Sequence, residues 1–274
     1  MRRALILLPL VVVSLLSGVA SAAPAPPPTE KLALLIGIDR FQGATRPNFG
    51  GAGDVSDMRE LLIRSGWAPG NIRVLTDEGA RAADIRSGLR WLVDRSSPTS
   101  FSVVHYSGHT QQSGSTEYLW PHDNQLIPDT ELAASLRQLR GKAWIDISGC
   151  EAAGFVQDGL ASPERLVTAS SQATEKSYEW VEMRRSLFTY FLVQRGMLAG
   201  EADANRDKLV SVQEVFAYAA DRAPRFSAGQ AQGAQHPFIA GGDGAPLFLH
   251  DAMPAPAAPT ASTRRCFLIF CSSG

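Results

Sequence analysis

Short apolar runs alternate along the chain with stretches in which apolar residues recur every three or four positions. Continuous apolar runs are typical of buried strands in a parallel sheet, and the sequence predicts them at 31–37, 72–76, 101–106, 143–147, 165–169 and, last, 246–249. Helical spacing of apolar residues predicts helices between the strands, at 54–62, 83–92, 132–139, 187–198 and 212–219. This alternation predicts an α/β domain, a mainly parallel sheet flanked by helices on both faces.

The first 22 residues have the pattern of a secretory signal peptide. Arg2 and Arg3 are basic, residues 4–16 are mostly apolar, and Ala20 to Ala22 fit a small-residue cleavage site. The alternative is a membrane anchor, which the short apolar core disfavours. We therefore expect an exported protein, periplasmic or secreted, with a Pro/Ala spacer at 23–30 and a single domain at 31–250.

The charge balance gives little indication of a charged partner. Without Arg2 and Arg3 the chain has 24 basic and 27 acidic residues, a net charge of −3. A nucleic-acid surface needs a concentrated basic patch, so we expect no nucleic-acid partner. The 45% hydrophobic content is that of a globular domain with a full core.

Residues 251–274 have the composition of a flexible tail with an unusual end. Residues 253–262 are rich in Ala, Pro, Ser and Thr, and an apolar segment then lies between Cys266 and Cys271. This segment is too short to span a membrane. Whether it docks on the domain, on a partner or against a membrane is left open by the sequence.

The chain has three cysteines, an odd number for a protein bound for an oxidising compartment. The simplest partition pairs Cys266 with Cys271 and leaves Cys150 as a free thiol. The alternative for Cys150 is a buried and inert side chain.

Cys150 and His109 carry the main chemical prediction. Cys150 follows the apolar run 143–147, and His109 follows the run 101–106. Open α/β sheets place their chemistry outside the carboxyl ends of the strands. A thiol and an imidazole brought there from neighbouring strands make a nucleophile and its base, so the sequence favours a cysteine hydrolase.

The segments 105–109 (His-Tyr-Ser-Gly-His) and 148–154 (Ser-Gly-Cys-Glu-Ala-Ala-Gly) resemble the caspase-like cysteine peptidases, and within them the bacterial metacaspase-like branch. The order is also that of the family, with the base 41 residues before the nucleophile here and about 50 in caspases. The Gly-Ala-Gly-Asp54 segment is similar to the family's helix start. The resemblance covers residues 31–249.

This resemblance implies a three-layer caspase-like sandwich and an endopeptidase that acts on proteins or peptides through a thioester. It implies that Cys150 is the nucleophile and His109 the base, that the backbone N–H groups of Cys150 and Thr110 form the oxyanion hole, and that the chemistry needs no cofactor. The neighbouring His105 sits in mid-strand and is expected to be a core histidine or one that supports the residues of the site.

Two positions depart from the family's pattern. Thr110 stands where the family has Gly, and a β-branched residue does not readily take a positive φ. Ser148 stands where an Asp helps to hold a basic substrate side chain. Asp54, Asp146 and Ser148 are the candidate substrate-binding residues, and the resemblance implies cleavage after basic residues.

These departures support an alternative, a catalytically silent caspase-like module that binds protein partners.

Between 170 and 183 the sequence is polar and predicts a plain loop, whose Glu175 and Glu179 are weaker candidates for the rim of the cleft.

Residues 203–214 match the spacing of a calcium-binding loop. The predicted ligands are Asp203, Asn205, Asp207, the carbonyl of Leu209, Ser211 and Glu214. Lys208 stands where the loop's turn prefers glycine. The alternative is an Asp/Asn turn whose side chains cap the next helix. A bound Ca²⁺ would brace the late helices and take no part in the chemistry.

Overall fold

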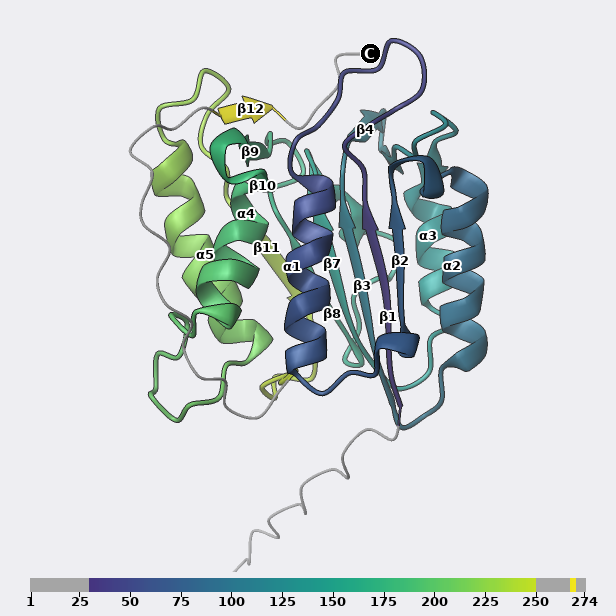
Figure 1. The fold of residues 1–274 in the computed structure, drawn as a ribbon, viewed down its shortest axis with the longest axis vertical. Coiled ribbons are helices and arrows are strands. Elements are labelled where there is room, and N and C mark those ends of the chain that lie inside the picture. Colours follow the sequence, from purple (N-terminus) through teal and green to yellow (C-terminus); the bar gives the residue numbers. More distant parts are fainter. Residues whose placement is uncertain (1–29, 250–266, 270–274) are drawn as a thin grey trace, which may run out of the picture.

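The computed structural model describes residues 30–249 and 267–269 of the chain. A six-stranded sheet forms its centre, in the order β11-β8-β7-β3-β1-β2 (Figure 1). All neighbours in this sheet are parallel except β11, which runs antiparallel to β8. The strands are β1 (Glu30–Gly37), β2 (Ile72–Thr76), β3 (Ser100–Ser107), β7 (Lys142–Ser148), β8 (Arg165–Ala169) and β11 (Phe238–Gly241).

Helices cover both faces of the sheet (Figure 1). One face packs against α1 (Gly51–Arg64), α4 (Leu187–Thr189) with its π-helical continuation η5 (Tyr190–Leu198), and α5 (Val212–Ser227). The other face packs against α2 (Ala82–Arg95) and α3 (Asp129–Leu136). Side chains of successive strand residues point to opposite faces, which is why each strand contributes to both apolar clusters. The predicted three-layer α/β fold is confirmed.

Short 3₁₀ turns join several of these elements: η1 (Pro69–Asn71), η2 (Asp77–Gly79), η3 (Ala152–Val156) and η4 (Val181–Met183). Two small sheets lie beside the main one. The first contains β4 (Thr110–Ser113), β5 (Thr116–Leu119) and β6 (Ile127–Pro128). The second has the order β10-β9-β12, from β10 (Arg185–Ser186), β9 (Tyr178–Trp180) and β12 (Phe267–Ile269).

The structure corrects two predictions about secondary structure. The last strand of the main sheet is β11, whereas the predicted strand at 246–249 makes only an isolated bridge between Phe248 and Ser211. β11 is an edge strand whose residues are half-buried or exposed, so it lacks the continuous apolar run that marks central strands. The stretch 170–183 is not a plain loop, because β9 lies within it.

A close approach of two backbones sets where α1 begins. A Cβ on Gly37, at the end of β1, would lie 2.1 Å from the carbonyl oxygen of Gly51, at the start of α1. Only glycine allows this contact. It fixes the N-terminus of α1 next to the carboxyl edge of the sheet.

The predicted leader at 1–22 and most of the spacer and tail lie outside the described residues, so these boundaries stay predictions. Within residues 30–249 and 267–269, no helix is long and apolar enough to cross a membrane.

Candidate active site

The carboxyl ends of β3 and β7 bring the segments of His109 and Cys150 side by side. Ser107 pairs with Ser148 in the register of the two strands, and Gly108 N donates to Ser148 O at 3.1 Å. Beyond the strands, Thr110 Oγ1 donates to Cys150 O at 2.6 Å. The predicted position of both residues, at neighbouring strand ends, is therefore observed.

His109 is fully buried between aromatic rings. Its imidazole stacks on Phe41 with ring centroids 4.8 Å apart, and Trp120 meets it edge-on at 6.1 Å. Its Nε2 lies 2.8 Å from the carbonyl oxygen of Arg46. No sequence pattern indicates Arg46, because its contribution is a backbone atom in a loop.

Cys150 is also fully buried, and the backbone N–H of Ser177 donates to its Sγ at 3.3 Å. The sulfur is disulfide-bonded in this structure, so the prediction of a free thiol is wrong. Because the chain has only two other cysteines, the predicted Cys266–Cys271 pairing is wrong with it. Both tail cysteines lie outside the described residues.

Serine hydroxyls fix the backbone just before Cys150. Gly149 O accepts hydrogen bonds from Ser177 Oγ at 2.6 Å, Ser170 Oγ at 2.8 Å and Ser171 Oγ at 3.2 Å, and Gly149 N donates to Ser170 Oγ. A buried carbonyl with three donors cannot turn without losing them. The orientation of the Cys150 backbone is therefore held by the strand end of β8 and the segment leading into β9.

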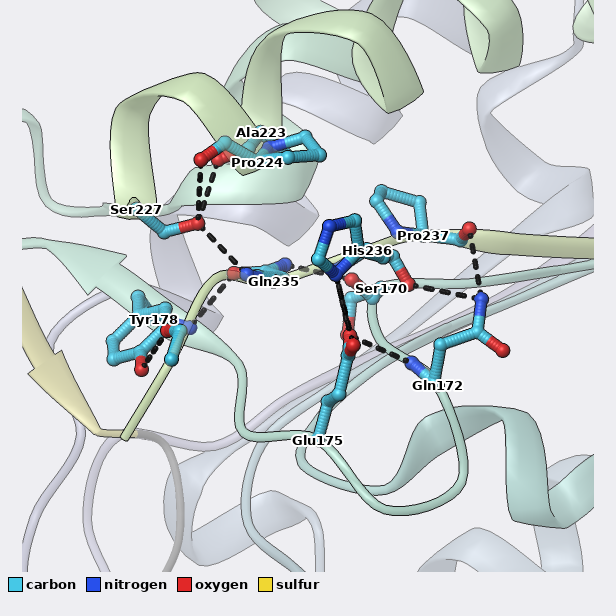
Figure 2. A network of polar contacts seen from close by, with 11 residues as sticks. Ser170, Gln172, Glu175, Tyr178, Ala223, Pro224, Ser227, Gln235, His236 and Pro237 are labelled. Carbon is cyan, nitrogen blue, oxygen red and sulfur yellow. Dashed lines mark hydrogen bonds and ion pairs between the residues drawn. The ribbon is translucent and has the colours of Figure 1, made fainter. Parts of the chain in front are cut away.

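Gln235 ties this serine cluster to β9. Its Nε2 donates to Ser170 O at 2.8 Å, and its Oε1 accepts from Tyr178 N at 3.0 Å. Figure 2 shows Gln235 between these two groups, with Ser227 of α5 accepting from the Gln235 backbone. Glu175, the first of the two predicted rim residues, instead bonds the backbone and ring of His236.

Two of the candidate substrate-binding residues meet at Ser186. Asp54 Oδ2 accepts from Ser107 Oγ at 2.7 Å, and its carboxylate also accepts from Ser186 N. Ser148 Oγ donates to Ser186 Oγ at 3.0 Å. Burial raises the pKa of Asp54 to about 7, because its charge is removed from water.

Asp146, the third candidate, lies on β7 two residues before Ser148, and its carboxylate contacts other buried side chains. Its Oδ2 lies 2.7 Å from His105 Nδ1, and its Oδ1 accepts from Thr168 Oγ1 at 2.5 Å. All three side chains are fully buried. His105 is thus the core histidine that the sequence predicts.

Glu179 is the acidic residue that sequence reasoning undervalued. It lies on β9, two residues after Ser177, and its Oε1 accepts from Phe49 N and Gly50 N at 2.7 Å each. Burial raises its pKa to about 7, although these two hydrogen bonds oppose the shift. Glu179 therefore holds the backbone just before α1, on the strand that follows Ser177.

Thr110 opens β4 and does not have a positive φ. Threonine at this position is therefore accommodated by ordinary extended backbone. Its hydroxyl instead holds the Cys150 carbonyl, a contact that glycine could not make.

The predicted calcium ligands are engaged in local hydrogen bonds. Asp203 accepts from the N–H groups of Asp207 and Lys208, and Asp207 Oδ1 accepts from Leu209 N. Glu214 forms a capping box with Ser211 at the start of α5. Among the described residues no group of three or more His, Cys, Asp or Glu side chains is suited to a metal ion. Calcium binding therefore stays a prediction, beside the alternative of an Asp/Asn turn.

Similarity to known proteins concerns the domain as a whole. The family model of the caspase domain matches residues 30–241, which include both strand ends of the candidate site. Metacaspase-1 of Eremothecium gossypii is 32% identical over 122 residues, a match covering 38% of this chain and 27% of that protein. The chain thus spans about a quarter of the length of this relative.

A solved structure shows the same fold at low identity. The crystal structure of a Geobacter sulfurreducens protein superposes with a TM-score of 0.58 at 15% identity, covering 77% of this chain and 94% of that one. At this identity the likeness concerns the fold.

Proposed function

Because this chain belongs to the caspase domain family, we propose that it is a cysteine endopeptidase with Cys150 as nucleophile and His109 as general base. The observation that carries the proposal is the meeting of the two segments at the ends of β3 and β7, joined by the hydrogen bond from Thr110 to the Cys150 carbonyl. The predicted leader adds export to the proposal.

The contact between His109 and Arg46 supports the role of a base. A carbonyl oxygen only accepts, so the Nε2 facing it carries the hydrogen of the neutral ring. Nδ1 then has the lone pair needed to take a proton from a thiol. The Arg46 carbonyl also stabilises the imidazolium that forms, since it accepts from a charged donor.

The reaction follows from these roles once Cys150 is reduced. His109 takes the thiol proton, and Cys150 Sγ attacks the peptide carbonyl. The N–H groups of Cys150 and Thr110 are proposed to stabilise the oxyanion. His109 then gives its proton to the leaving amine, and a thioester remains. Water, deprotonated by His109, hydrolyses the thioester and restores the thiol.

Buried acids support a preference for basic residues. Asp54 and Glu179 both lie near the N-terminus of α1, and Asp39 caps Gly51 and Ala52 there. Removal from water favours the neutral acids, and a substrate ammonium or guanidinium would restore their charged form. We therefore propose Glu179 and Asp54 as the groups that select a basic side chain, with Ser148 and Asp146 behind them.

The test compares reduced wild type with Cys150→Ala and His109→Ala. A peptide library should be cleaved by wild type alone, with cuts after Arg or Lys. Labelling of Cys150 by iodoacetamide at pH 7 should slow at least tenfold in His109→Ala. Labelling that is independent of His109, with no peptide cleaved, would support the silent binding module instead.

A further inference from the structure

The tail strand β12 pairs with β9, the strand that follows the residue in contact with the candidate nucleophile. β12 pairs antiparallel with β9, with Phe267 opposite Trp180 and Ile269 opposite Tyr178. The residue before Tyr178 is Ser177, whose N–H donates to Cys150 Sγ. The C-terminal segment therefore reaches the residue next to the sulfur from a position far away in sequence.

β9 has one edge that the domain core does not use. Its other edge pairs with β10, through Trp180 with Arg185 and Glu179 with Ser186. An unpaired strand edge accepts an extended peptide through backbone hydrogen bonds. In this structure the occupant is a segment of the same chain.

Both candidate partners of Cys150 lie in the tail, because the chain has only two other cysteines, Cys266 and Cys271. The described part of β12 pairs Ile269 with Tyr178, the residue after Ser177, and Phe267 with Trp180, further from the sulfur. Cys271 follows Ile269 in the sequence and Cys266 precedes Phe267. Because a disulfide requires Cα atoms about 4.4–6.8 Å apart, we expect Cys271, which follows the end of β12 nearer to Ser177, to be the partner.

We propose that the C-terminal segment is an internal inhibitor, which adds β12 to the free edge of β9 and locks it there by a Cys150–Cys271 disulfide. The proposal rests on the proposed function. The proposal gives the observed disulfide at Cys150 a role. A cysteine in a disulfide has no thiolate with which to attack a peptide, so the disulfide keeps the site inactive. An oxidising compartment, which the leader predicts, would keep this form.

Activation is then a thiol–disulfide exchange with a dithiol reductant. One thiolate of the reductant attacks the Cys271 sulfur and releases Cys150 as a thiolate, which takes up a proton. The second thiol of the reductant attacks the mixed disulfide and frees Cys271, and the reductant leaves as its own disulfide. Two electrons and two protons pass to the enzyme. β12, no longer tethered, can then be displaced by a substrate strand.

The first test is a map of the disulfide in the full chain, equilibrated with oxidised glutathione and digested with chymotrypsin without reduction. Cleavage after Phe267 and Phe270 separates Cys266 from Cys271, so each linked peptide is distinguishable by mass. We expect the Cys150 peptide linked to Cys271. A link to Cys266, a free Cys150 or a Cys150–glutathione adduct would overturn the proposal.

The second test uses matched variants. Without reductant, Cys271→Ser should release Cys150 for iodoacetamide labelling, and Cys266→Ser should leave it at least tenfold slower. Equal labelling of the two would overturn the lock. If Cys271→Ser frees the thiol and no peptide is cleaved even after reduction, the lock stands and the peptidase proposal fails.

The strand itself is tested in fully reduced protein. Leu268→Pro removes an N–H from β12, so the tail should compete less with substrate. We expect a several-fold lower KM with kcat unchanged, and the matched Leu268→Ala should retain the wild-type KM more closely. An unchanged KM in Leu268→Pro would show that β12 does not occupy the substrate's place.

Discussion

Nε2 of His109 lies 2.8 Å from the carbonyl oxygen of Arg46, which belongs to a loop 63 residues earlier in the chain. This contact fixes both the ring's orientation and its tautomer, because a carbonyl cannot donate a proton. The rings of Phe41 and Trp120 also constrain the imidazole. The chemistry proposed for His109 therefore depends on residues that do not react.

Phe41→Ala should reduce the reactivity of Cys150 in the reduced protein. Losing the stacked ring removes about 0.5–1.5 kcal/mol of aromatic interaction beyond the buried area, which lets the imidazole rotate. We expect iodoacetamide labelling at pH 7 to slow about two- to tenfold, measured by mass spectrometry. Phe41→Tyr keeps the ring and should label like wild type. Normal labelling in folded Phe41→Ala would contradict a positioning role.

Thr110→Val should destabilise the protein by about 1–3 kcal/mol. Valine keeps the shape but leaves the buried Cys150 carbonyl without the hydroxyl that donates to it at 2.6 Å. The measurement is urea unfolding of the oxidised protein. Thr110→Ser retains the hydroxyl and serves as the control, and a Val variant as stable as the Ser variant would show that this hydrogen bond contributes little.

Asp54→Asn should weaken the dependence of stability on pH. The pKa of Asp54 is about 7 when folded against 3.8 as the ordinary value, so the folded chain holds this proton more tightly than the unfolded chain. The associated stability is fully present below about pH 3.8 and is lost as pH rises through 7. Asparagine removes that loss, which is on the order of a few kcal/mol.

The measurement for Asp54 is the free energy of unfolding at several pH values between 4 and 8. Glu179 and Glu117, whose pKa values are also raised to about 7, should leave a residual slope. Asp158→Asn changes a carboxylate on the surface and should reproduce the wild-type slope. A slope in Asp54→Asn equal to wild type would mean that Asp54 is charged throughout this range.

Lys208→Gly should stabilise the loop at 203–214. Lys208 has φ of 70°, in the left-handed region where a side chain costs about 1 kcal/mol. We expect a gain of about 0.5–1 kcal/mol in thermal unfolding, and a further rise of Tm with added Ca²⁺ if the loop binds it. Lys208→Ala removes the charge but keeps Cβ, so it separates backbone strain from charge. No gain for Gly over Ala would refute the backbone explanation.

Local pattern in the sequence determined the fold class and the approximate ends of the central strands. Strands β1, β3 and β7 are continuous apolar runs because both faces of the sheet are covered by helices. The placement of His109 and Cys150 at the same edge of the sheet follows directly from that pattern, since the carboxyl ends of parallel strands lie at one edge.

Only the tertiary structure decided what surrounds those two side chains. Three contacts join segments 63 to about 130 residues apart: the Arg46 carbonyl with His109, the N–H groups of Phe49 and Gly50 that donate to the Glu179 carboxylate, and the β12–β9 pairing. The disulfide at Cys150, where the sequence predicts a free thiol, is likewise a contact between segments far apart in the chain. The spacing of apolar residues predicts which side of a helix or strand is buried. The contacts that a side chain makes depend on which loops the folded sheet brings to its carboxyl edge.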